Sequence, residues 1–168
     1  HTLETFYAPN LRLIRSMKKP VISAINGVAA GVGANIAFAC DIVVAGKSAK
    51  FIQSFGKVGL VPDAGGTWSL AHAIGPMRAK ALAMTAEPLT AEMAESWGLV
   101  WKVFDDDALL DEARALTASL SNGPTVGFAT AKAVIDQAIN NSFETQLQVE
   151  ADAQRACGRL KDYAERVT

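Results

Sequence analysis

A carboxylate able to move a proton, that of Asp63, lies in a loop rich in glycine and proline. The loop belongs to the stretch FIQSFGKVGLVPDAGGTW, residues 51–68, and a helix is expected to follow it. A carboxylate in this place can cap the coming helix, and it can also act as a general base beside a bound ligand. The residues around Asp63 leave both interpretations open.

A second stretch, NGVAAGVGANIAFACD at residues 26–41, carries almost no reactive side chain and offers backbone groups instead. It leads from a strand-like run into a helix-like run. The first N–H groups of a helix lack intrahelical partners and carry partial positive charge, and Gly31 and Gly33 let a ligand approach the backbone. Such a turn can hold a phosphate or stabilise an oxyanion. It can equally be a place where a helix packs closely on a strand.

Two better-known phosphate-binding patterns do not fit this turn. The full dinucleotide spacing with its downstream acidic residue is missing, and no Lys-Ser/Thr pair follows the glycines. Structural roles are favoured for His72, which ends an alanine-rich helix, and for Asp41. Cys40 and Cys157 are far apart and lack metal-ligand spacing, so we expect reduced, buried thiols and no metal site.

The composition is that of an ordinary globular protein. Half of the 168 residues are hydrophobic, and the formal net charge is −1. So small a net charge argues against a nucleic-acid partner. No apolar run approaches the ~18 charge-free residues that a membrane span needs. We therefore expect no membrane association and a cytoplasmic location.

The elements that must position these groups alternate between buried strands and helices, which predicts an α/β fold with parallel strand pairing. Short apolar, β-branched runs predict strands over residues 21–25, 41–46, 49–55 and 99–104. Helical spacing and capping signals predict helices over residues 3–19, 34–40, 68–75 and 76–85, a helix capped by Thr90, and three more over residues 106–120, 124–138 and 142–155. Gly75 and Pro76 are expected to separate two helices.

Taken together, KPVISAINGVAAGVGANIAFACDIVVAGKSAKF (residues 19–51) and GLVPDAGGTW (59–68) strongly resemble the crotonase (enoyl-CoA hydratase/isomerase) superfamily. The resemblance continues through the rest of the chain. It implies a spiral of ββα units over residues 1–104 and a helical trimerisation region over residues 105–168, giving a homotrimer or a dimer of trimers. It also implies that the chain is truncated at its N-terminus, with part of the family's core and most of the coenzyme A site upstream of His1.

The resemblance assigns a role to both stretches. In crotonases a coenzyme A thioester carbonyl lies between two backbone N–H donors, and the second donor matches Val32, flanked by Gly31 and Gly33. The first donor would lie upstream of His1. Asp63 matches the catalytic aspartate of several family isomerases. Asn35, Phe55 and Trp68 are implied as substrate-binding residues. Coenzyme A enters as part of the substrate, so no separate cofactor is expected.

The same matching favours isomerisation over hydration. The two glutamates of family hydratases correspond to Asn35 and Phe55, and neither side chain can move a proton. The context of Asp63 looks most like the branch that rearranges 1,2-epoxyphenylacetyl-CoA to an oxepin-CoA, whose relatives convert 3-enoyl-CoA to 2-enoyl-CoA. An apolar surround of Phe55, Leu60, Val61 and Trp68 is expected to raise the pKa of Asp63. Two alternatives stay open: an enoyl-CoA hydratase, and a non-catalytic acyl-CoA-binding protein.

Overall fold

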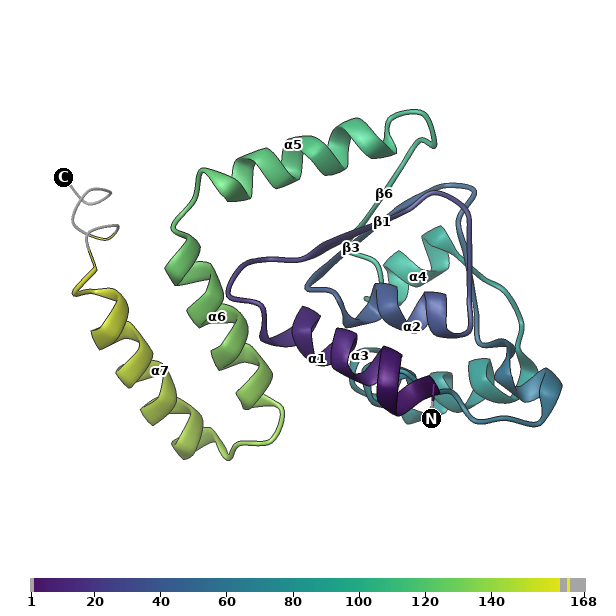
Figure 1. Ribbon diagram of the computed structural model, residues 1–168, viewed down its shortest axis with the longest axis horizontal. Coiled ribbons are helices and arrows are strands. Elements are labelled where there is room, and N and C mark those ends of the chain that lie inside the picture. The colour runs from purple at the N-terminus through teal and green to yellow at the C-terminus, as the bar shows by residue number, and fades with distance from the viewer. Residues whose placement is uncertain (1, 161–162, 164–168) are drawn as a thin grey trace. The chain divides into compact units, whose positions relative to one another are not determined.

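The computed structural model describes residues 2–160 and residue 163 (Figure 1). Contacts along the chain divide it into two compact units. One comprises the residues through Arg15 together with Val21–Leu116, and the other comprises Ser16–Pro20 and the residues from Thr117 onward. The first unit contains all of the sheet structure and every candidate site residue.

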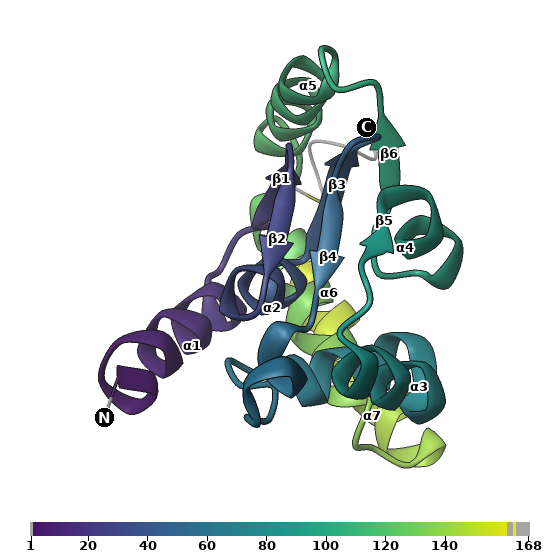
Figure 2. The ribbon, with the colours of Figure 1, turned by 90° about the vertical axis from the view of Figure 1, so that its right-hand side faces the viewer.

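Two three-stranded sheets build the first unit. The strands β1 (Ile22–Ile25), β3 (Ile42–Gly46) and β6 (Lys102–Phe104) form one sheet in that order, with parallel pairing. The strands β2 (Val28–Ala30), β4 (Lys50–Ile52) and β5 (Leu89–Thr90) form the second. Figure 2 shows β1 beside β3 and β2 beside β4, and the chain turns from the first sheet into the second after β1 and again after β3.

Each such strand pair leads into a helix. β1 and β2 are followed by α2 (Val32–Ala39), whereas β3 and β4 are followed by the 3-10 helix η2 (Ser54–Val58) and then by α3 (Gly66–Thr85). This order gives two consecutive ββα units, as expected. The prediction of parallel pairing holds for β2 with β4 but is wrong for β5, which pairs antiparallel to β4. The short strands β2 and β5 were not predicted, because two or three residues carry no period-2 signal.

The remaining helices confirm most of the predicted boundaries within a few residues. They are the π-helical turn η1 (Leu3–Tyr7), α1 (Ala8–Ser16), α4 (Ala91–Trp97), α5 (Leu109–Ser121), α6 (Thr125–Ala138) and α7 (Phe143–Cys157). The backbone of Gly75 is non-helical, with φ 78° and ψ 160°, so the predicted break ahead of Pro76 is confirmed. The hydroxyl of Thr90 accepts a hydrogen bond from the N–H of Met93, which confirms the predicted cap.

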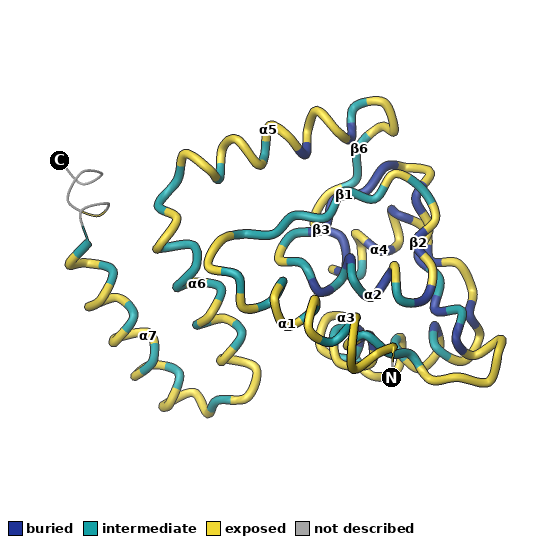
Figure 3. Tube along the Cα trace, in the orientation of Figure 1, coloured by how far each residue is buried: buried dark blue, intermediate teal, exposed yellow. Residues whose placement is uncertain are grey.

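The core lies where the sheets meet α2, α3 and α4. Its fully buried members include Leu70 and Leu89, and Figure 3 shows buried residues concentrated around these elements. A second, smaller cluster joins Val44 of β3 to Leu109 and Ala113 of α5. In contrast, α6 and α7 pack against each other as a helical hairpin without a single buried residue. Their role in trimerisation, and the division of the chain at residues 104 and 105, stay predictions. Within the described residues, no helix combines the length and apolar character of a membrane span.

Candidate active site

The turn that precedes α2 presents uncapped backbone donors, as the glycine pattern predicts. Gly31 adopts φ 53° and ψ −123°, and its N–H donates to the carbonyl oxygen of Ile52 at 2.8 Å. The first intrahelical bond runs from the N–H of Asn35 to the carbonyl oxygen of Gly31. The N–H groups of Val32 and Gly33 therefore fall in the first turn, where a helix supplies no acceptor, and Gly31 provides no side-chain cap.

The space around this turn is tight on one side and open on the other. A β-carbon at Gly31 would lie 3.2 Å from the hydroxyl of Ser54 and 3.5 Å from the ring of Phe55. A β-carbon at Gly33 would meet nothing within 4 Å, and Gly33 is exposed. The buried ring of Phe55 thus packs close to Gly31, whereas Gly33 lies at an open position.

Asp63 lies in the loop between η2 and α3. Its carbonyl oxygen accepts a 2.8 Å hydrogen bond from the N–H of Gly66. The helix α3 begins at Gly66 with Gly65 as its cap residue, and no side chain caps it. The capping interpretation of the Asp63 carboxylate is therefore wrong. The carboxylate therefore does not cap this helix.

The environment of the Asp63 carboxyl group raises its pKa. Its Oδ1 atom is buried and has no hydrogen-bond partner among the described residues. Burial raises the pKa of Asp63 above its ordinary value of 3.8, since a desolvated carboxylate is disfavoured. The expected direction is correct, but part of the expected cause is wrong. Leu60 and Val61 are 64% and 77% exposed, so they form no apolar wall around this carboxyl group.

Asn35 ties the Asp63 loop to the first turns of α2. Its side chain is fully buried, and its Nδ2 donates to the carbonyl oxygen of Asp63 at 2.8 Å. Its Oδ1 accepts from Nε2 of Gln53, also at 2.8 Å. Gly66 packs so closely that a β-carbon there would overlap the Asn35 amide. The structure thus places Asp63 and α2 side by side through a buried chain of hydrogen bonds.

Trp68 stands at the surface, two residues into α3. It is 37% exposed, and its ring lies close to two other groups. The guanidinium of Arg15 lies 4.5 Å from the centre of the ring, and the ring of His72 lies 4.4 Å away. Nδ1 of His72 is 2.8 Å from the carbonyl oxygen of Trp68. His72 therefore belongs to a surface stack, in keeping with the structural role expected for it.

Asp41 and the two cysteines stay outside this arrangement. The Asp41 carboxylate accepts a 2.7 Å hydrogen bond from the N–H of Val21, where the chain enters β1. Cys40 and Cys157 form no disulfide, and both are half-buried rather than buried as expected. The thiol of Cys40 donates to the carbonyl oxygen of Ile36 at 3.5 Å. Within residues 2–160 and at residue 163, no cluster of His, Cys, Asp and Glu side chains is suited to hold a metal ion.

Comparison with known proteins identifies the family. Residues 2–167 match the family described as Enoyl-CoA hydratase/isomerase. The chain belongs to this family. It is 47% identical to a 1,2-epoxyphenylacetyl-CoA isomerase from Escherichia coli K12, over 99% of this chain and 64% of the relative. It is 35% identical to a crotonyl-CoA hydratase from Syntrophomonas wolfei, over 94% of this chain and 60% of the relative. The chain thus spans less than two thirds of the length of these relatives.

Solved structures of the family share the fold. A crystal structure of an enoyl-CoA hydratase from Polaromonas sp. JS666 superposes with a TM-score of 0.94 at 35% identity, covering 98% of this chain and 64% of that one. A family protein from Thermobifida fusca YX, crystallised in complex with acetoacetyl-CoA, gives a TM-score of 0.83 at 33% identity, covering 87% of this chain and 57% of that one. The ββα arrangement is therefore the crotonase fold of this family, as the sequence resemblance implies.

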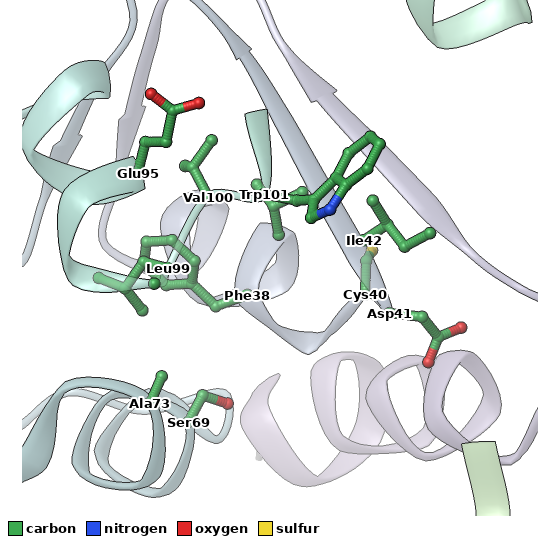
Figure 4. Close-up of a pocket in the computed structure, with 12 residues that line it drawn as sticks. Phe38, Cys40, Asp41, Ile42, Ser69, Ala73, Glu95, Leu99, Val100 and Trp101 are labelled. Atoms are coloured by element: carbon green, nitrogen blue, oxygen red, sulfur yellow. The ribbon is translucent and has the colours of Figure 1, made fainter. Parts of the chain in front are cut away.

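One pocket is lined by residues other than those of the candidate site. A pocket of about 510 Å³ opens between the end of α2, α3 and the segment that follows α4 (Figure 4). None of the predicted site residues lines it. Its lining residues are Phe38, Cys40, Asp41, Ile42, Val43, Ser69, Ala73, Glu95, Gly98, Leu99, Val100 and Trp101. We therefore place the candidate site by its chemistry, at α2 and Asp63, rather than by the size of a cavity.

Sequence reasoning missed one residue of the site, Gln53. Its side chain is 3% exposed, and its Oε1 is buried without a partner among the described residues. A buried polar side chain with an unpaired atom is rare enough in proteins to require an explanation. The sequence offers only a weak signal for it, a single Gln directly after a buried strand.

Proposed function

We propose that this protein is an acyl-CoA isomerase that acts through a thioester enolate. The observation that supports the proposal is the hydrogen bond from Asn35 of α2 to the backbone carbonyl oxygen of Asp63, which ties the Asp63 loop to the helix whose first turn is uncapped. In this proposal the N–H of Val32 donates to the thioester oxygen, and Asp63 is the catalytic acid–base residue. Gly31, Gly33, Asn35, Phe55 and Trp68 form the surrounding substrate-binding region.

The mechanism needs one carboxylate and no activated water. For a 3-enoyl-CoA, the Asp63 carboxylate removes a proton from C2, and the electron pair moves onto the thioester oxygen as a dienolate. The N–H of Val32 stabilises that oxygen, and removal of one such donor typically costs about 3–4 kcal/mol in the transition state. The protonated Asp63 then returns the proton at C4, which gives the 2-enoyl-CoA. Atoms and charge balance without a cofactor.

The raised pKa of Asp63 suits a group that must both accept and return a proton. A base is most effective when its pKa lies near the working pH, and burial shifts the pKa of Asp63 upward, in that direction. The Oδ1 atom of Asp63 accepts no hydrogen bond from the described residues, so no structural contact there occupies it. By the family resemblance, the two positions at which family hydratases carry glutamates hold Asn35 and Phe55 here, and neither side chain can activate water.

Two reactions are proposed for this site. One is the rearrangement of 1,2-epoxyphenylacetyl-CoA to an oxepin-CoA, supported by the 47% identity to the Escherichia coli isomerase. The other is the shift of a 3-enoyl double bond to the 2-position. An acyl-CoA as the ligand is supported by the relative that was crystallised with acetoacetyl-CoA. Hydration stays the alternative activity, because a crotonyl-CoA hydratase is also among the relatives.

We further propose a homotrimer or a dimer of trimers in the cytoplasm, with no nucleic-acid or membrane partner. The support for an oligomer is the surface of α6 and α7. Val126, Ile135, Phe143 and Leu147 are between 44% and 74% exposed, and no residue of either helix is buried. Helices with this much uncovered apolar surface ordinarily pack against a partner.

The decisive experiment follows proton transfer directly. The protein, expressed from its complete gene, is incubated with a 3-enoyl-CoA in deuterated water, and double-bond migration and deuterium uptake at C2 and C4 are measured. We expect both in the wild type, and a loss of at least hundredfold in Asp63→Asn with unchanged folding. Migration that survives the substitution removes Asp63 as the base. Water addition to a 2-enoyl-CoA without migration instead identifies a hydratase.

A further inference from the structure

Burying the Gln53 side chain costs free energy of folding. Its side chain is 3% exposed at the end of β4, and Oε1 is buried with no partner among the described residues. An unpaired buried carbonyl oxygen loses its hydrogen bonds to water without compensation. A methionine of similar length would avoid that loss. Among the described residues, the Gln53 side chain donates from Nε2 to Oδ1 of Asn35. We therefore look to this hydrogen bond for the role of Gln53.

Gln53, Asn35 and the backbone of Asp63 form a series of two hydrogen bonds. The last acceptor, the carbonyl oxygen of Asp63, fixes the direction of both. The carbonyl oxygen of Asp63 can only accept, so Asn35 must turn its Nδ2 toward it. Oδ1 of Asn35 must then face the other way and needs a donor. Gln53 supplies that donor with Nε2, and as a result its own Oε1 is left unpaired. The unpaired atom is thus the consequence of orienting Asn35.

We propose that Gln53 is a positioning residue, which fixes the orientation of the Asn35 amide and thereby holds the Asp63 loop against the first turns of α2. The proposal rests on the proposed role of Asp63 and refines that of Asn35. Both ends of the Asn35 amide are engaged within the protein. Asn35 therefore shapes the substrate region by placing Asp63.

The packing around Asn35 disfavours the opposite orientation of its side-chain amide. Asn35 is fully buried, and the α-carbon of Gly66 lies against its amide. If the amide turned over, its Oδ1 would face the carbonyl oxygen of Asp63, and two acceptors would repel each other. The loop would then shift relative to the N–H of Val32. A shift of about 1 Å in a reacting group can cost on the order of a hundredfold in rate.

The substitution Gln53→Glu tests whether Asn35 needs a hydrogen-bond donor at position 53. One variant tests it in both states, because its carboxyl group is a donor when protonated and not when ionised. A neutral carboxyl group has one O–H donor, which can serve Oδ1 of Asn35, whereas a carboxylate has none. We expect kcat of this variant to approach the wild-type value where the new carboxyl group is protonated, and to fall by roughly tenfold to a hundredfold as it ionises. KM should change little. Gln53→Met is the matched control, and it should show low kcat at every pH without this additional decline.

A second readout does not depend on activity. The side-chain amide protons of Asn35 should exchange slowly with solvent in the wild type, because Nδ2 is buried and bonded to Asp63. In Gln53→Glu this protection, followed by NMR, should disappear over the same pH range in which kcat falls. It should persist at all pH values in the wild type.

The outcomes separate this inference from the proposed function. If Gln53→Glu keeps the wild-type pH profile and Asn35 protection, or if Gln53→Met keeps wild-type kcat, Gln53 is not a positioning residue. If Asp63→Asn retains isomerisation, the proposed function fails, yet the exchange of the Asn35 amide still decides whether Gln53 orients it. Circular dichroism establishes that each variant is folded.

Discussion

The side-chain amide of Asn35 donates a 2.8 Å hydrogen bond to the backbone carbonyl oxygen of Asp63, 28 residues further along the chain. This bond joins the two stretches that carry the proposed chemistry. Asn35 lies one helical turn after Val32, so the bond also sets how the Asp63 loop meets the uncapped end of α2.

Gly66→Ala should disturb the junction without removing a functional group. A β-carbon at Gly66 would overlap the Asn35 amide, and the helix start at Gly66 is buried. We expect a loss of about 1–3 kcal/mol of unfolding free energy from overpacking, together with reduced isomerase activity. Urea denaturation and the migration assay measure the two effects.

Gly127→Ala is the matched control for that substitution. Gly127 lies in α6, where a β-carbon would meet only ordinary contacts at 3.6 and 3.7 Å. Alanine is the better helix former, so stability should rise by about 0.5–1 kcal/mol. Equal destabilisation by both substitutions would contradict the role assigned to the Gly66 contact.

Gly31→Ala should damage the turn that presents the Val32 donor. The backbone at Gly31 has φ 53° and ψ −123°, a conformation that residues with a side chain rarely adopt. The strain should cost about 1–3 kcal/mol, and thioester enolisation should slow because the first turn of α2 shifts. Gly33→Ala, at an open position in the same turn, should leave stability nearly unchanged. Thermal unfolding of the two variants, side by side, checks the difference.

The raised pKa of Asp63 has a predictable effect on stability. Because the folded protein binds this proton more tightly than the unfolded chain, wild-type stability should fall as pH rises from 3.8 through the folded-state pKa. Asp63→Asn removes this dependence. It should be slightly more stable than the wild type at neutral pH and lose that advantage below pH 3.8. The difference is small because Asp63 is only half-buried.

Denaturation curves of both proteins across this pH range provide the measurement, and an NMR titration of the Asp63 carboxyl carbon gives the pKa itself. A pKa of 3.8 for Asp63 in the free protein would contradict the predicted effect of burial. An Asp63→Asn variant less stable than the wild type at neutral pH would also count against it.

Thr90→Ala should destabilise α4 through its N-terminus. The Thr90 hydroxyl accepts from the N–H of Met93 at 3.3 Å, and loss of such a cap costs about 1 kcal/mol. Ser96→Ala is the control, because the Ser96 hydroxyl bonds only to the Met93 carbonyl oxygen one turn back in the same helix. Its effect should stay within about 0.5 kcal/mol. Guanidinium denaturation of the two variants distinguishes a cap from an ordinary surface hydroxyl.

Much of the fold could be predicted from local signals. Apolar β-branched runs located β1 and β3, Gly75 and Pro76 marked the break within α3, and Thr90 marked the start of α4. Such features depend on neighbours within one turn of chain, so the residue types specify them directly. The sequence alone also determined that the turn before α2 offers backbone donors and that Asp63 carries the carboxylate.

Only the tertiary structure decided how these pieces act together. The exposure of Leu60 and Val61, the pairing of β5 and the burial of Gln53 depend on contacts between distant segments. The direction of the Asn35 amide follows from a carbonyl oxygen 28 residues away and a donor 18 residues away. A side-chain amide presents both a donor and an acceptor, so its sequence position leaves the orientation undetermined until its partners are in place.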